Sequence, residues 1–201
     1  MFSVPFKYDA PPQVGALRQG ELLGEIWEHR PEHPPTALSS DASIQYRSVR
    51  HPLVMVMNPD CDLEWDFQSR FPDESTQSTY TPAPEASKPN VLISHVLLCD
   101  VYEKGNIINR VPPGRDIWKR IEQNQDERYH HFPPASVCNS LREDLPDLFL
   151  DFKKVFGLPT ESLYGGLRIH AVSRIALVPP IYIHDLTHRF YGFLSRVGLP
   201  E

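Results

Sequence analysis

A cysteine flanked by two carboxylates follows a short apolar run in this chain. The run, residues 53–57, is too short for a typical helix and predicts a buried strand. Asn58-Pro59 ends it, and Asp60-Cys61-Asp62 is predicted to form the turn that follows, a common place for functional groups. Cys61 could be the nucleophile of a cysteine hydrolase, although two neighbouring negative charges disfavour the thiolate. The alternative is a small buried residue at a turn whose carboxylates cap the backbone.

Histidine and acidic side chains elsewhere could serve acid–base or metal chemistry. Asp60, Asp62, His95 and Cys99 include metal-ligand types and are candidate binding residues, but no short-spaced pair fixes a coordination geometry. The sequence therefore predicts no metal and no cofactor. In the segment Arg128 to Pro134, His130 is the candidate proton-transfer residue, and the alternative is a packed strand histidine.

Arg50, at the entrance to the buried strand, has the strongest case for a functional role among the basic residues. A guanidinium there could stabilise negative charge that develops on a phosphate, or it could be an exposed strand-end arginine. Arg110, Arg115, Lys119 and Arg120 form a second basic group, but acidic residues follow at once. We therefore expect a solvated, salt-bridged helix face there.

Composition limits the class of protein. The chain has 201 residues, which suits one domain, a net charge of -6 and 21 prolines, and the charge argues against a general nucleic-acid binder. Its three cysteines show no CxxC spacing. No signal peptide and no membrane-spanning run are visible. We expect a soluble, cytoplasmic protein with reduced thiols.

The predicted elements are short strands joined by long loops. Residues 1–19 read as an extended arm, and strands are expected at residues 20–27, 44–49, 53–57, 91–102, 128–134, 148–152 and 169–178. Residues 68–90 are polar and proline-rich, which predicts a mobile loop. A helix is predicted within residues 114–127. This pattern favours an α+β protein, mainly β, built on a small, strongly bent barrel over residues 20–135.

A second helix is predicted over residues 183–197, inside an extension that covers residues 136–201. Its apolar residues recur at helical spacing, and Gly198 and Pro200 would end it. Four aromatic residues lie in or next to it, more than one packed stripe needs: Tyr182, Phe190, Tyr191 and Phe193. Some of them are expected to contact a partner, with core packing as the alternative.

The order of these elements resembles the PemK/MazF family of toxins. The resemblance covers about residues 20–135 and lies in the Gly24-Glu25-Ile26-Trp27 strand, the Arg50-His51-Pro52 entrance to a buried strand, and the buried strand that follows. It implies an SH3-like barrel, a homodimer, and metal-independent cleavage of single-stranded RNA with Arg50 as the catalytic arginine. The family's second catalytic group is a hydroxyl, and this chain has Cys99-Asp100 at that position. The Asp-Cys-Asp-Leu turn also resembles uncharacterised bacterial proteins with a Cys-Asp-Leu turn.

Three functional hypotheses follow. The leading one is a degenerate MazF-like barrel that binds another protein, through its C-terminal helix or its barrel groove, in a bacterial toxin, defence or stress-signalling system. The second is an active metal-independent endoribonuclease that uses Arg50 and His130. The third is a cysteine hydrolase centred on Cys61.

Overall fold

The computed structural model describes residues 6–32, 45–111, 114–138 and 144–196. Its centre is a sheet of six strands in the order β4-β5-β3-β2-β1-β6, with every neighbouring pair antiparallel. The strands are β1 (Glu21–Pro31), β2 (Tyr46–Val56), β3 (His95–Glu103), β4 (Tyr129–Phe132), β5 (Leu148–Pro159) and β6 (Ser173–Leu177). The α-helices are α1 (Asp60–Arg70), α2 (Glu74–Thr79), α3 (Lys104–Ile107), α4 (Arg115–Glu122), α5 (Thr160–Arg168) and α6 (Pro180–Leu194). Short 3-10 turns, η1 (Pro89–Val91) and η2 (Ile108–Arg110), complete the described elements.

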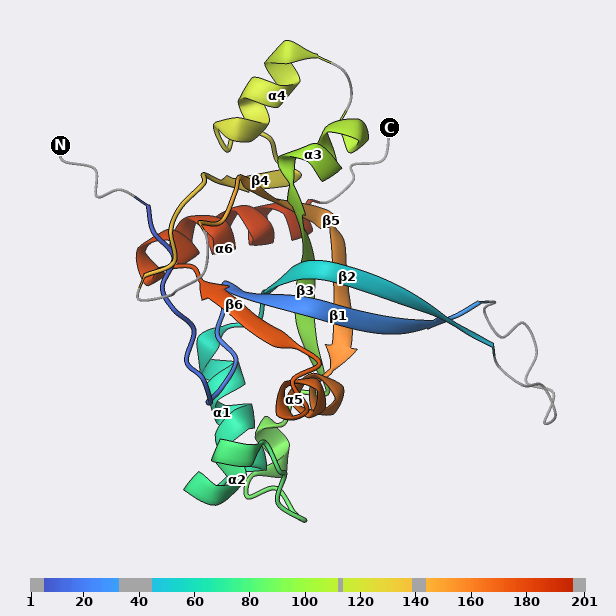
Figure 1. Ribbon diagram of the computed structural model, residues 1–201, viewed down its shortest axis with the longest axis vertical. Coiled ribbons are helices and arrows are strands. Elements are labelled where there is room, and N and C mark those ends of the chain that lie inside the picture. The colour runs from blue at the N-terminus through green and yellow to red at the C-terminus, as the bar shows by residue number, and fades with distance from the viewer. Residues whose placement is uncertain (1–5, 33–44, 112–113, 139–143, 197–201) are drawn as a thin grey trace.

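The sheet is strongly twisted but does not close. In Figure 1, β1 and β2 run across the direction of β3 and β5, and the distal half of the β1–β2 pair projects from the body. The edge strands β4 and β6 are not hydrogen-bonded to each other. An α+β architecture is therefore confirmed, whereas the predicted barrel is not.

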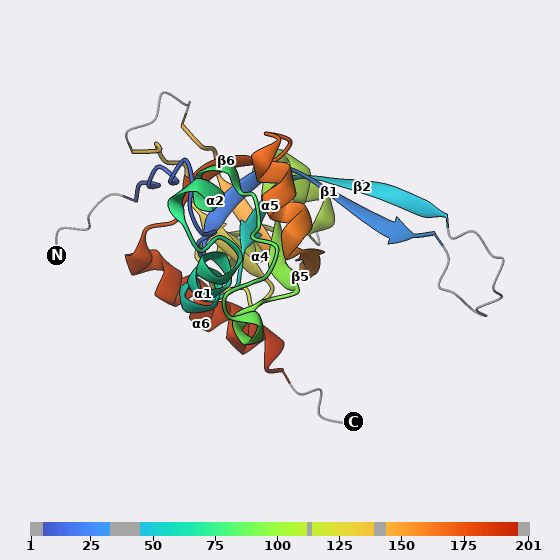
Figure 2. The same ribbon diagram turned by 90° about the horizontal axis from the view of Figure 1, so that it is seen from below.

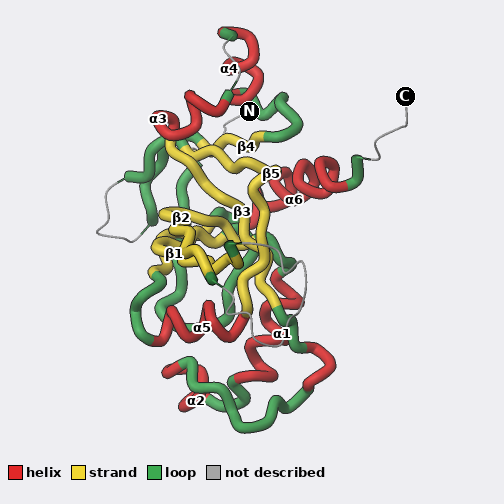
Figure 3. Tube along the Cα trace, turned by 90° about the vertical axis from the view of Figure 1, so that its right-hand side faces the viewer, coloured by secondary structure: helices red, strands yellow, loops and turns green. Residues whose placement is uncertain are grey.

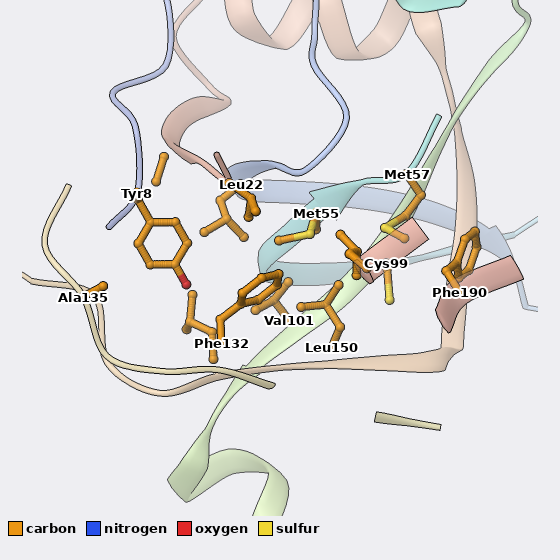
Figure 4. Close-up of a cluster of buried hydrophobic side chains, with 14 of the residues drawn as sticks. Tyr8, Leu22, Met55, Met57, Cys99, Val101, Phe132, Ala135, Leu150 and Phe190 are labelled. Atoms are coloured by element: carbon orange, nitrogen blue, oxygen red, sulfur yellow. The ribbon is translucent and has the colours of Figure 1, made fainter. Parts of the chain in front are cut away.

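Helices cover both faces of this sheet, and each face has its own buried cluster. Leu186 and Phe190 of α6 pack with strand residues on one face, the cluster shown in Figure 4. On the other face, α1 and α5 contribute Phe67 and Tyr164. A third, smaller cluster joins α3 and α4 to the β4–β5 end of the sheet, and Figure 3 shows these two helices at the opposite end of the molecule from α1, α2 and α5.

The structure corrects two predictions near the middle of the chain. Asp60-Cys61-Asp62 is not a turn but the first turn of α1, where acidic side chains interact favourably with the helix dipole. Residues 68–90 are not a continuous loop, since they contain the end of α1, all of α2, and the start of η1. The Asp73 side chain and Thr76 form a capping box at the start of α2, a signal that the sequence prediction missed.

Both terminal segments pack against the sheet over the residues described. The predicted extended arm, residues 1–19, places Tyr8 and Leu17 in the interior, each fully buried. The C-terminal helix is present as predicted in type, but it begins earlier, at Pro180, because proline is well accommodated in the first turn of a helix. No described helix has the length and apolar character needed to cross a membrane.

Candidate functional site

A groove of about 700 Å³ opens where β2, β3 and β5 meet α3 and η2. We call it the His51 groove. Five basic residues line it, Arg30, Arg50, Arg110, Lys153 and Lys154, against two acidic ones, Asp100 and Glu103. The chain as a whole carries a net charge of -6, so this groove concentrates positive charge on an acidic protein.

The imidazole of His51 lies at the centre of the groove and is only 5% exposed. Its Nδ1 lies 2.5 Å from Oδ1 of Asp100, and its Nε2 lies 3.1 Å from Oε2 of Glu28. A carboxylate only accepts hydrogen bonds, so both ring nitrogens must donate and the ring is an imidazolium. Burial by itself would lower the pKa of His51, but the hydrogen bonds and charges of Asp100 and Glu28 outweigh it, and the pKa is raised.

Aromatic rings pack around this charged centre. Phe156 stacks on the His51 ring with centroids 4.2 Å apart. The hydroxyl of Tyr102 donates to Asp100 at 3.0 Å, and burial together with the Asp100 charge raises the pKa of Tyr102. The Arg110 guanidinium lies over the Tyr102 ring, 4.5 Å from its centroid, and also donates to the Tyr102 hydroxyl at 3.2 Å. Each of the two aromatic rings of the groove thus has one face against a cation, Arg110 or His51.

A backbone irregularity in β5 brings the two lysines to the groove. Cys99 pairs with Val155 and Val101 pairs with Leu150, so residues 151–154 of β5 stand opposite Asp100 alone. Such a bulge bends the strand and redirects its side chains. Lys153 and Lys154 lie in this bulge and line the groove. Neither ammonium group forms an ion pair with a described residue, which leaves both charges available to a ligand.

A buried carboxylate holds the bulge in place. Asp151 is fully buried and accepts from Nε and Nη2 of Arg128 at 2.7 and 2.5 Å. It also accepts from the backbone N–H of Lys153 at 3.1 Å. The Asp151 carbonyl accepts from the Cys99 thiol at 3.4 Å. These contacts fix the backbone next to Lys153 and thus the origin of both lysine side chains.

A second irregularity lies in β1, next to the residue that pairs with His51. Glu25 adopts φ 63, a left-handed conformation that is uncommon for a residue with a side chain. Leu23 and Ile26 consequently lie in the same buried cluster, which strict alternation along a strand would not allow. His51 pairs with Ile26 and shares its side of the β1–β2 pair. Glu25 faces solvent and binds Arg50.

This arrangement is suited to holding an anion and not to moving a proton. Both nitrogens of His51 are engaged by carboxylates, so neither is left to exchange a proton with a ligand. The lysines and Arg110 provide positive charge at the groove surface, where phosphate or carboxylate oxygens would bind.

The three predicted catalytic residues lie in different surroundings. Arg50 borders the His51 groove, but its guanidinium makes two hydrogen bonds to Glu25, at 2.9 and 2.7 Å. His130 is 2% exposed, accepts from Nε of Arg189 at 3.1 Å, and burial and the Arg189 charge lower its pKa to about 3. Cys61 is exposed in the first turn of α1, where its thiol donates to Asp62 at 3.5 Å.

The other predicted binding residues, Asp60, Asp62, His95 and Cys99, do not gather around one ligand site either. Asp60 binds the Arg18 side chain and the Gln19 backbone N–H. His95 is exposed, with its Nδ1 3.1 Å from the hydroxyl of Ser94. Cys99 is fully buried, and burial raises its pKa. Among the described residues, no three His, Cys, Asp or Glu side chains are placed to hold a metal ion.

Most of the aromatic residues of α6 pack inward. Phe190 is 1% exposed and contacts Phe152, and Phe193 lies against the same ring. Tyr182 packs edge-on against Phe6, and only Tyr191, at 46%, is among the exposed large hydrophobic residues. Core packing therefore accounts for most of the aromatic surplus, and a protein partner at this helix stays a prediction.

Sequence reasoning missed the centre of the groove because its residues come from distant segments. Glu28, His51, Asp100 and the pair Lys153-Lys154 are brought together by sheet pairing and by the β5 bulge. One signal was available, since two adjacent lysines follow the apolar run that ends at Phe152. Comparisons with protein families, curated proteins and solved structures found no match.

Proposed function

We propose that this protein binds single-stranded RNA in the His51 groove and holds it without cutting it. The observation that carries this proposal is the concentration of basic side chains in one groove of an acidic protein, with Lys153 and Lys154 free of ion pairs to described residues. A negatively charged backbone needs such a local positive surface, because neutralised phosphates release counterions and binding becomes favourable.

Aromatic surfaces favour a nucleic acid over an acidic peptide. Tyr102 and Phe156 line the groove, and both are half-buried, with one face of each ring against Arg110 or His51. Single-stranded nucleic acids are commonly bound by a positive groove whose aromatic rings stack on successive bases. An acidic peptide would use the cations but would gain little from the flat rings beside them.

Hydrogen-bond acceptors in the groove favour RNA over DNA. Asp100 and Glu103 are carboxylates among the cations, and Asn106 adds an amide. These groups can accept a hydrogen bond from the ribose 2′-hydroxyl, which is the feature that distinguishes RNA from DNA at a binding site. Both ring nitrogens of His51 are hydrogen-bonded to carboxylates, so His51 has no free nitrogen for proton transfer, and this supports binding without cleavage.

The test is fluorescence anisotropy with a labelled 12-nucleotide single-stranded RNA in chelator, over a range of KCl concentrations. For a single strand, each neutralised phosphate contributes about 0.7 to the slope of log affinity against log salt, so Lys153→Gln/Lys154→Gln should reduce the slope by about 1.4. The matched control is Arg115→Gln/Lys119→Gln, an exposed basic pair on α4 outside the groove, which should leave the slope unchanged.

Three outcomes would overturn the proposal. Folded parent protein that binds no RNA, or a slope that the lysine variant leaves unchanged, would remove the groove as an RNA site. A gel of the same samples should show intact RNA. Cleavage by the parent that the lysine variant abolishes would make the groove catalytic. A DNA strand of the same sequence should bind more weakly than the RNA.

A further inference from the structure

The distal half of the β1–β2 pair carries aromatic rings on its outer face. We call residues 27–31 of β1 and 46–50 of β2 the arm. Trp27 pairs with Arg50, His29 with Ser48, and Pro31 with Tyr46. Directly paired residues in an antiparallel ladder lie on the same face, and successive residues alternate. Trp27, His29 and Tyr46 therefore share one face, opposite to the face that carries His51.

These rings are exposed to an unusual degree for their size. Trp27 is 51% exposed and Tyr46 is 59% exposed, and neither belongs to a buried cluster of the described residues. Figures 1 and 2 show the arm extending away from the rest of the sheet. Large apolar side chains exposed together indicate an interaction surface.

The position of this face connects it to the His51 groove. Trp27, His29 and the Pro31–Tyr46 pair follow one another at two-residue steps of about 6.7 Å, so Tyr46 lies about 13 Å along the arm from Trp27 and the two rings would take bases that are not adjacent in an extended single strand. Arg50 lies on this face beside Trp27 and also borders the His51 groove. Its guanidinium binds Glu25, so a phosphate at Arg50 would compete with that ion pair.

We propose that the outer face of the arm is a base-stacking platform for the same single-stranded RNA whose backbone the His51 groove holds. This inference rests on the proposed function. The strand would leave the groove past Arg50, and its bases would then stack on Trp27 and farther along the arm on Tyr46. The platform recognises bases by their flat faces and so adds affinity with little preference for sequence.

The experiment compares a 12-nucleotide RNA with an abasic 12-mer that keeps the same backbone. Trp27→Ala/Tyr46→Ala removes two stacking rings and should weaken binding of the RNA at least about thirtyfold. The same variant should bind the abasic strand as the parent does. Trp65→Ala is the matched control, because Trp65 is 57% exposed but lies on α1.

A direct readout comes from Trp27 as the single tryptophan, in Trp65→Phe/Trp118→Phe protein. Addition of RNA should quench its fluorescence, and addition of the abasic strand should not. Two results would overturn the platform while leaving the groove in place: RNA affinity that depends on Lys153 and Lys154 but not on Trp27 and Tyr46, or Trp27 fluorescence unchanged at saturation. Folded parent protein that binds neither strand would overturn the groove and the platform together.

Discussion

Replacing Arg128 by alanine tests whether the buried carboxylate of Asp151 depends on its partner. The Asp151 side chain is 1% exposed, and its two hydrogen bonds to Arg128 are 2.7 and 2.5 Å long. Removing one member of a buried ion pair typically costs about 3–5 kcal/mol, because the remaining charge is left in a poorly solvated site. Arg128 is 31% exposed, so water can replace part of it, and we expect a loss of about 3 kcal/mol.

Urea unfolding followed by circular dichroism measures this loss, with Arg18→Ala as the matched control. Arg18 makes an equivalent pair of hydrogen bonds to Asp60, each 3.1 Å, but both side chains are about half exposed. Exposed pairs contribute at most about 1 kcal/mol. Adding Asp151→Asn to Arg128→Ala should restore part of the stability. A loss for Arg128→Ala no larger than that for Arg18→Ala would refute this account of Asp151 and of the bulge that it holds.

Three further predictions follow from burial and charge. The pKa of His51 is higher in the folded protein than in the unfolded chain, where it is about 6.5. Protonated His51 therefore stabilises the fold fully at pH values below about 6.5, and this contribution should disappear as the pH rises through the pKa of the folded protein. The free energies of unfolding of the parent and of His51→Asn, measured from pH 5.5 to 9, should therefore converge at high pH. A difference between them that grew with pH would contradict this prediction. Iodoacetamide should modify exposed Cys61 in the folded protein but Cys99 only after unfolding, as mass spectrometry of the labelled peptides would show. Phe190→Ala should cost about 3–5 kcal/mol in urea unfolding, because Phe190 is 1% exposed against the sheet, and a loss under about 1 kcal/mol would place it outside the core.

Most elements could be predicted from local patterns. Continuous apolar runs give β2 and β3, whose inner residues are buried on both faces, and helical spacing gives α6. The prediction was wrong where local rules compete. Asn58-Pro59 indicates the end of a strand equally well before a turn or before a helix, and here Pro59 is the N-cap of α1. In residues 68–90 a capping box and buried Tyr80 outweigh a polar composition.

The candidate site was largely beyond prediction, for a physical reason. Arg50 was identified because it precedes the apolar run, but it lies within β2, and the neighbouring residue His51 is the one that is buried. Which of two adjacent residues faces inward depends on strand alternation, and the register that sets it is fixed by pairing with β1. The bulge in β5 likewise depends on the distant residue Arg128. Gly24, directly before Glu25, is the one local signal of the irregularity in β1, and the bulge in β5 has no glycine or proline within residues 151–154.

The cations of the groove differ in how much charge they can offer to a ligand, and this leads to a last prediction. The guanidinium of Arg50 is matched by Glu25, and that of Arg30 by Glu28, whereas Lys153 has no ion-pair partner among the described residues. Binding a phosphate at Arg50 must compete with an existing ion pair, so fewer counterions are released there. Lys153→Gln should therefore reduce the salt slope of RNA binding by about 0.7, and Arg50→Gln by clearly less. Equal changes would mean that Glu25 gives way to the ligand, and Arg50 would then be a principal phosphate contact.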